Sequence, residues 1–185
     1  MPSHPLTYSS LLKTASLLLR PFLTSLCFIP ILLFFSTCNK ASTEPELPPA
    51  THSGKNFIAF RVNGRAIVIS GYRSLVYKHS VGANCYYTLN NDLIIDGTTE
   101  DRLYRLKIYF KFNSVTGIYN IIDQYPYEAF FSDYNMYSVN SIHQGTINVD
   151  YFENGICSGI FAFDAVNTDD SVVHITDGRF DIVMD

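Results

Sequence analysis

The sequence predicts an all-β fold, an antiparallel β-sandwich or partly closed barrel of about nine strands that are mostly connected by hairpins. The 185-residue chain is 15% aromatic without any Trp, and its Tyr, Phe, Val and Ile residues are spread through residues 57–184. These residue types favour strands over helices. Several segments alternate apolar and polar residues with a period of two, and dipeptides that favour tight turns separate them.

The clearest candidate strand covers residues 103–112. Its apolar face consists of Tyr104, Leu106, Ile108, Phe110 and Phe112. The opposite face carries Arg105, Lys107 and Lys111. This alternation predicts an antiparallel strand with one face in the core and one face in water. Residues 146–152 alternate in the same way, and shorter candidate strands lie at 57–62, 65–70, 85–89, 93–96, 118–122, 156–164, 172–176 and 179–184.

The turn signals agree with these strands. Asn63-Gly64 predicts a hairpin over residues 57–70, and Asn154-Gly155 predicts a hairpin between 146–152 and 156–164. Asp96-Gly97 and Asp177-Gly178 also supply residue types that adopt the positive φ angles of tight turns. No stretch after residue 56 shows a capped helical pattern, which disfavours parallel βαβ units.

Residues 1–37 have the composition of a targeting segment. Lys13 and Arg20 are its only Lys or Arg residues, and they precede an uncharged run from residue 21 to residue 37 that contains Pro30. A stable membrane span needs about 20 apolar residues, more than this run provides. We therefore expect a cleaved signal peptide, and an uncleaved membrane anchor is the alternative.

The hexapeptide Phe35-Ser36-Thr37-Cys38-Asn39-Lys40 follows this run and resembles the lipobox of bacterial lipoproteins. The resemblance implies cleavage before Cys38 and acylation of that residue, with palmitate among the acyl chains, in the cell envelope. The expected location is the outer membrane, on its periplasmic or surface face. A chance cysteine at the edge of an ordinary signal is the alternative. Residues 38–55 are rich in Pro, Ser and Thr, which predicts a flexible tether before a single domain at 56–185.

Cleavage would leave 11 basic and 17 acidic residues, a net charge of −6. This acidic balance disfavours nucleic acid as a partner. It would also leave Cys85 and Cys157 as the two thiols other than Cys38. We predict a disulfide between them, because both lie in candidate strands of a secreted domain. Two separately buried thiols are an equally good interpretation, since unpaired Cys is among the most buried residue types.

Five ordered motifs resemble a family of small Bacteroidetes lipoproteins classed only as a domain of unknown function. The motifs are Phe60-Arg61-Val62-Asn63-Gly64, Thr116-Gly117-Ile118-Tyr119, Gly145-Thr146-Ile147-Asn148-Val149, Ser158-Gly159-Ile160-Phe161-Ala162-Phe163 and Ile175-Thr176-Asp177-Gly178-Arg179-Phe180-Asp181. Together they span most of residues 56–184. The resemblance implies a fold and an envelope location, but it brings no active-site residue with it.

Motifs that would indicate catalysis are missing from the sequence. It has no His-Glu-x-x-His, no Gly-x-Ser-x-Gly and no phosphate-binding Gly-x-x-x-x-Gly-Lys, and its histidines at 79, 143 and 174 are isolated. We therefore expect a protein that is not an enzyme and that uses no cofactor and no metal site.

The segment from residue 123 to residue 137 carries six aromatic residues without clear alternation. We predict that Tyr125, Tyr127, Tyr134 and Tyr137 form a surface for a glycan or an envelope protein, because tyrosine combines a flat apolar face with a polar tip. A lid of aromatic rings packed over the sheet is the alternative. The expected function is a lipid-anchored binding or interaction module in the cell envelope, and a purely structural lipoprotein without a small ligand is the alternative.

Overall fold

The computed structural model describes residues 46–71 and 81–184, so the segment expected to be a signal peptide, Cys38 and His79 lie outside the described residues. The regular structure of the described part consists of strands. They are β1 (Phe57–Val62), β2 (Arg65–Ser70), β3 (Gly82–Tyr87), β4 (Asp92–Thr98), β5 (Arg105–Lys111), β6 (Gly117–Ile121), β7 (Glu128–Ser132), β8 (Met136–Ser138), β9 (Gly145–Glu153), β10 (Ile156–Val166) and β11 (Val172–Val183).

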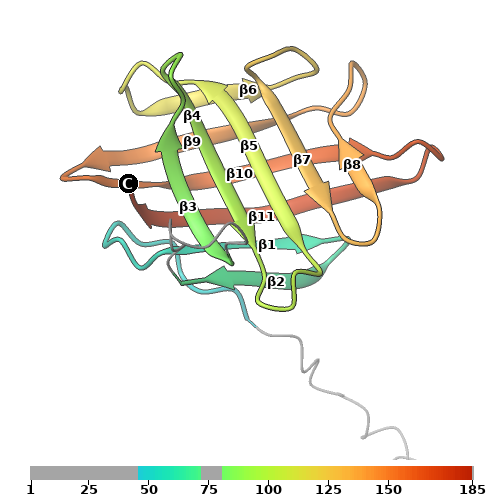
Figure 1. Cartoon of the computed structure of the whole chain (residues 1–185), viewed down its shortest axis with the longest axis horizontal. Coiled ribbons are helices and arrows are strands. Elements are labelled where there is room, and N and C mark those ends of the chain that lie inside the picture. The colour runs from blue at the N-terminus through green and yellow to red at the C-terminus, as the bar shows by residue number, and fades with distance from the viewer. Residues whose placement is uncertain (1–45, 72–80, 185) are drawn as a thin grey trace, which may run out of the picture. The chain divides into compact units, whose positions relative to one another are not determined.

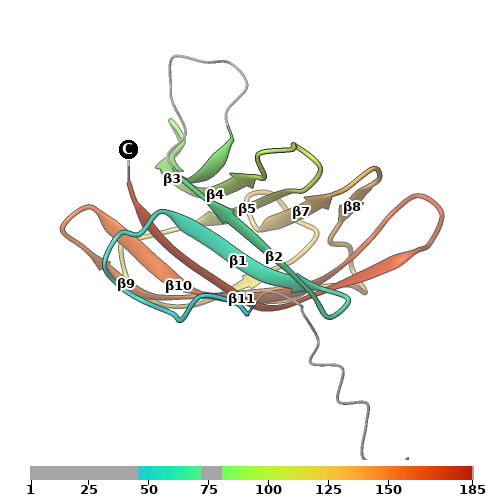
Figure 2. The ribbon, with the colours of Figure 1, turned by 90° about the horizontal axis from the view of Figure 1, so that it is seen from below.

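The strands form one antiparallel sheet that folds into two layers (Figure 1). The back layer has the order β6-β9-β10-β11-β1-β2, and the front layer has the order β8-β7-β5-β4-β3. The front strands cross the back strands steeply, and Figure 2 shows the two layers from below. Orthogonal packing of this kind needs corners where strands pass from one layer to the other.

One corner is made by the end of β10, where Val166 pairs with Ser138 of β8. At the opposite edge the Gly71 carbonyl, just after β2, accepts a hydrogen bond of 3.0 Å from the Ala83 N–H on β3. The sheet is therefore nearly closed. This architecture confirms the expected all-β fold, and β7 and β8, which were not predicted from the sequence, bring the number of strands in the described residues to eleven.

The core lies between the layers. On β5 the inward side chains Leu106, Ile108 and Phe110 are fully buried, as the alternation predicted. Phe60 of the back layer meets Phe131 of the front layer edge to face, with ring centroids 6.0 Å apart. Burying such a side chain contributes about 1.5–3 kcal/mol, so contacts of this kind hold the layers together.

Both predicted Asn-Gly hairpins are present. Asn63 and Gly64 have φ angles of 49° and 88° between β1 and β2, and Asn154 and Gly155 have φ angles of 53° and 73° between β9 and β10. Consecutive positive φ angles match the right-handed twist of the flanking strands. The register of β1 and β2 then pairs every residue from Phe57 to Val62 with one from Ser70 to Arg65.

The two Asp-Gly dipeptides are not hairpin turns. Asp177 has a φ of 52°, but it lies inside the continuous strand β11, where the registers with β1 and β10 both shift at a bulge. Gly97 lies inside β4, at a point where the two layers approach so closely that a side chain would not fit. A Cβ atom at this position would stand 2.9 Å from the Cδ1 atoms of both Ile58 and Ile69.

The aromatic segment is neither a lid nor a single loop, because it contains β7 and β8. On β7 the side chains of Ala129 and Phe131 are buried, while Phe130 between them is only partly buried. The adjacent phenylalanines hide this alternation in the sequence, since an apolar residue occupies both faces.

The predicted disulfide is not present in the structure. Cys157 of β10 is a buried free thiol. Cys85 of β3 is also buried, in the same core cluster. The described arrangement is the alternative interpretation, in which the cysteines pack as small apolar residues.

Candidate functional site

The four tyrosines predicted as one surface lie in different environments. Tyr137 of β8 is only 7% exposed and packs beside Phe131, with ring centroids 6.0 Å apart. Tyr127 is partly buried against the same core. Tyr137 therefore does not belong to a ligand surface, and its burial corrects the prediction.

Tyr125 and Tyr134 are exposed, but they lie beyond opposite ends of β7. Tyr134 is 89% exposed in the β7–β8 turn. The Tyr125 hydroxyl donates a 2.8 Å hydrogen bond to Oδ2 of Asp92 at the start of β4. This bond to a carboxylate raises the pKa of Tyr125 above its ordinary value, because it favours the protonated phenol. The exposed tyrosines thus form two separate points and no continuous surface.

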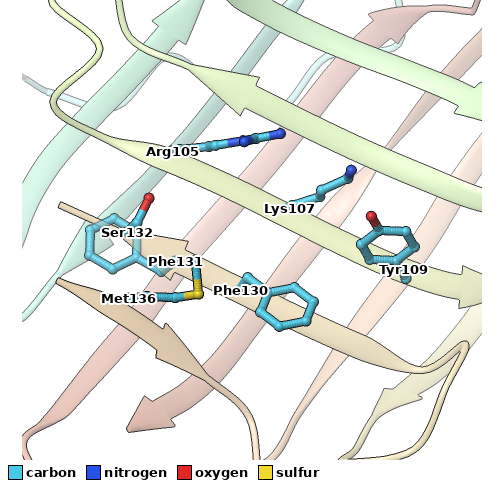
Figure 3. Close-up of a pocket in the computed structure, with 7 residues that line it drawn as sticks. All are labelled: Arg105, Lys107, Tyr109, Phe130, Phe131, Ser132 and Met136. Atoms are coloured by element: carbon cyan, nitrogen blue, oxygen red, sulfur yellow. The ribbon is translucent and has the colours of Figure 1, made fainter. Parts of the chain in front are cut away.

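A pocket of about 250 Å³ lies on the outer face of the front layer (Figure 3). We call it the β5–β7–β8 pocket. It is lined by Arg105, Lys107, Tyr109, Phe130, Phe131, Ser132 and Met136. The lining combines two cations with aromatic and thioether groups, and it contains no carboxylate.

Strand register brings these residues together. Lys107 of β5 stands opposite Phe130 of β7, and Arg105 stands opposite Ser132, which in turn pairs with Met136 of β8. Alternate residues of a strand point to the same face, so Arg105, Lys107 and Tyr109 all face outward. The pocket therefore arises from three neighbouring strands whose backbone ladders fix which residues stand side by side.

Ring and charge contacts organise the middle of the pocket. The Lys107 ammonium lies 4.7 Å from the centroid of the Tyr109 ring, a cation–π contact. The Tyr109 and Phe130 rings meet edge to face at 6.2 Å. Nε of Arg105 lies 3.4 Å from a carboxylate oxygen of the buried Asp96. These contacts hold two cations and two rings next to a solvent-accessible surface.

A second groove, of about 440 Å³, lies on the outer face of the back layer. Its walls include Ile118, Asn148, Ile160 and Arg179. The Arg179 guanidinium is already engaged, because Nη1 donates to the Pro48 carbonyl at 3.0 Å and Nε donates to the Asp177 carbonyl at 3.2 Å. This groove is also lined by the carboxylate of Asp177, whereas the lining of the β5–β7–β8 pocket has two cations and no carboxylate, so the β5–β7–β8 pocket is the better candidate for a ligand that needs a cation.

Residues 46–56 form an N-terminal strap that packs on the outer face of the back layer. Leu47 is buried in a small cluster with Phe57, Ala59 and Ala66. The strap corrects the expectation of a flexible tether as far as residue 55. Composition alone concealed this, since one Leu and a few hydroxyl groups are enough to fix the segment.

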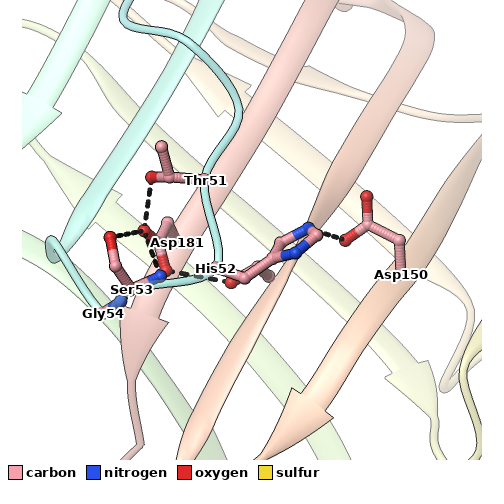
Figure 4. Close-up of polar contacts among 7 residues, drawn as sticks. Thr51, His52, Ser53, Gly54, Asp150 and Asp181 are labelled. Carbon is pink, nitrogen blue, oxygen red and sulfur yellow. Dashed lines mark hydrogen bonds and ion pairs between the residues drawn. The ribbon is translucent and has the colours of Figure 1, made fainter.

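Asp181 of β11 holds the strap through its carboxylate (Figure 4). Oδ2 accepts hydrogen bonds from the Thr51 hydroxyl at 2.6 Å and from the Ser53 N–H at 3.1 Å, and Oδ1 accepts from the Gly54 N–H at 2.7 Å. The Ser158 hydroxyl adds a further bond to Oδ1 at 2.9 Å. Burial alone would raise the pKa of Asp181, but these donors outweigh it and hold the pKa below its ordinary value.

His52 extends the same strap toward β9. Its ring stacks on Tyr151 with centroids 5.1 Å apart, and Nε2 lies 3.3 Å from a carboxylate oxygen of Asp150. These groups join strap and sheet. The cluster therefore has a structural role in fixing the N-terminal segment.

Among residues 46–71 and 81–184, no group of three or more His, Cys, Asp or Glu side chains is arranged to hold a metal ion. His174 is exposed on β11 and pairs with Asp164 at 2.8 Å. The same part of the chain contains no helix long and apolar enough to cross a membrane.

Sequence reasoning assigned Arg105 and Lys107 to the solvent face of a strand, but it did not connect them with Phe130, Ser132 or Met136. The connection depends on which strand lies beside β5.

No protein-family model, curated protein or solved structure matches this chain.

Proposed function

We propose that this protein is a lipid-anchored binding module of the cell envelope and that its ligand site is the β5–β7–β8 pocket. The observation that carries the proposal is the pocket itself, in which Arg105 and Lys107 adjoin the outward rings of Tyr109 and Phe130. Sites for ligands typically combine apolar walls with a few placed polar groups. The proposed role is non-catalytic and needs no cofactor.

The exposure of apolar groups in this pocket supports a binding role. Met136 is 71% exposed and lines the pocket together with Phe130, whereas Phe131 is fully buried in the core. Apolar surface costs about 25 cal/mol per Å² when it stays in water, so a grouped apolar surface favours a partner. The cations beside it select for a ligand that also carries negative charge.

The proposed location depends on Cys38, which follows the hydrophobic run of the signal-like segment. We also propose that the chain belongs with the small Bacteroidetes lipoproteins that its motifs resemble. Those motifs coincide with structural positions here, such as the Asn63-Gly64 hairpin and the bulge at Asp177-Gly178. This coincidence supports a shared fold and says nothing about a shared ligand.

Replacing Cys38 with Ala should move the protein from the detergent phase to the aqueous phase in a detergent-partition experiment. Acyl chains supply the membrane affinity in this proposal, and stable anchoring takes two lipid signals. Mass spectrometry of the unmodified protein should show that it begins at an acylated Cys38. A Cys38→Ala protein that still enters the detergent phase and retains residues 1–37 would instead establish the uncleaved membrane anchor.

The binding role can be tested with paired double variants. Lys107→Ala with Phe130→Ala removes a cation and a ring from the pocket. Lys111→Ala with Tyr134→Ala removes a cation of the same strand and a highly exposed ring, both outside the pocket lining. Retention on arrays of purified polysaccharides and purified envelope proteins should fall at least tenfold in the first pair and stay within twofold in the second.

Melting temperatures of both pairs should stay close to that of the unmodified protein, because neither pair removes a core residue. Equal retention of the two pairs would remove the pocket from the proposal. If the unmodified protein is retained on no member of either array, the structural lipoprotein becomes the better description of this chain.

A further inference from the structure

We infer that the β5–β7–β8 pocket recognises an acidic saccharide, a sugar unit that carries a carboxylate within a polysaccharide. The inference rests on the proposed function and names the ligand class for the same site. It follows from the charge of the lining, the shape of the apolar groups and the size of the pocket.

The residues that line the pocket carry charge opposite to that of the chain, and the nearest carboxylate is that of the buried Asp96, which stands opposite Lys107 on β4 and beside Arg105. Residues 38–185 carry 11 basic and 17 acidic residues, yet the pocket lining contains Arg105 and Lys107 without a carboxylate. The two cations lie two residues apart on one strand, so their Cα atoms are about 7 Å from each other. Arg105 faces Asp96 through Nε, which is one of the five N–H donors on a guanidinium. A carboxylate between these cations would form charge-assisted hydrogen bonds.

The apolar groups distinguish a sugar from a simple anion. Phe130 lies opposite Lys107 on the neighbouring strand, and Tyr109 meets Phe130 edge to face. A pyranose ring has an apolar C–H face that packs against an aromatic ring, and its carboxylate projects from the edge of the ring. A phosphate ion or an acidic peptide side chain carries charge without such a face. The lining therefore matches an anionic group and a flat apolar group side by side.

The size of the pocket fits one sugar unit of a longer chain. Its volume of about 250 Å³ is below the roughly 300–1,000 Å³ typical of sites that enclose a whole drug-sized ligand. The pocket is lined by outward side chains of three neighbouring strands, so a polymer bound there could continue along the outer face of the sheet. Ser132 adds a hydroxyl that can exchange hydrogen bonds with a sugar hydroxyl.

The test measures binding of the full chain in detergent to polygalacturonate, alginate and hyaluronate, with polyglutamate as the charge control. At least one of the three polysaccharides should bind. Its carboxyl-reduced form should bind at least tenfold more weakly, and so should polyglutamate of similar charge. Lys107→Ala and Phe130→Leu should each weaken binding to the acidic polysaccharide at least fivefold, while Lys111→Ala should change it less than twofold. Phe130→Leu keeps an apolar side chain and removes only the flat ring.

Three results would overturn the inference. Binding of none of the three polysaccharides would do so, and equal binding of polyglutamate would show nonspecific ion exchange. Equal binding of the carboxyl-reduced polymer would show a site for neutral sugars. If the arrays described above retain the protein on an envelope protein through Lys107 and Phe130 while all acidic polysaccharides fail, this inference is wrong and the binding module stands. A melting temperature for each variant separates lost binding from lost folding.

Discussion

Replacing Asp181 with Asn should lower the free energy of unfolding at neutral pH by about 3 kcal/mol or more, since each hydrogen bond to a charged group contributes about 1.5–3 kcal/mol. The side chain is buried, and it accepts bonds from Thr51, Ser53, Gly54 and Ser158. An Asn amide at this position turns one acceptor into a donor that faces other donors. The melting temperature should fall by roughly 10 °C for a domain of this size.

Asp150→Asn is the matched control for this prediction. Asp150 also contacts the strap, through His52, but it does so at the protein surface. Its replacement should change the free energy of unfolding by less than about 0.5 kcal/mol. Urea titrations of the two variants give the comparison, and equal losses would contradict the central role of Asp181.

The contribution of Asp181 should also depend on pH. Its pKa in the folded state lies below the ordinary value of 3.8. Above that value the carboxylate is charged in both states, and its stabilising contribution is fully present. As the pH falls below 3.8 toward the folded pKa, the unfolded chain binds the proton first and the contribution is lost. The stability gap between the unmodified protein and Asp181→Asn should therefore shrink as the pH falls through this range.

Replacing Gly159 with Ala should destabilise the domain by about 3 kcal/mol or more, at or above the upper end of ordinary overpacking costs. A Cβ atom there would lie 2.0 Å from the carbonyl oxygen of Asn148 and 2.8 Å from Cζ of Phe180. The first of these obstacles is backbone of the neighbouring strand β9, so it cannot rotate away. We expect β9 and β10 to separate at this point, with reduced yield of folded protein.

Gly155→Asn supplies the control for the packing argument. A Cβ atom at Gly155 meets nothing within 4 Å, and its φ of 73° is one that Asn tolerates better than most residues. This variant should lose less than about 1 kcal/mol. Circular dichroism during chemical denaturation distinguishes the two, and a Gly159→Ala protein as stable as Gly155→Asn would refute the close approach of β9.

The strands with clean alternation could be predicted from the sequence because each carries its own signal. Residues 57–62 and 65–70 match β1 and β2 at both ends, and the outward face of β5 was assigned correctly. Asp177-Gly178 could not be assigned in this way. A positive φ angle serves a bulge as well as a turn, and only the partners β1 and β10 decide between them.

The candidate site was less predictable because it depends on neighbours far apart in the sequence. Lys107 and Phe130 are opposite each other only through the β5–β7 ladder, and β6 intervenes between these strands in the chain. We predicted a ligand surface at the tyrosines of residues 123–137 because so many aromatic residues in one short segment are unusual. Their environments differ because the side chain of Tyr137 on β8 points into the core, whereas Tyr134 lies in the turn between β7 and β8.

The strap determines how the domain would be presented on a membrane. It begins on the outer face of the back layer, whereas the β5–β7–β8 pocket is built on the front layer, and Figure 2 shows these layers on opposite sides of the domain. With acyl chains on Cys38, as proposed, residues 39–45 could span at most about 25 Å even when fully extended. The segment that links the acylated Cys38 to the strap would then join the domain on the side remote from the pocket. The domain would present its cationic and aromatic face outward, where a polymer could reach it without approaching the bilayer.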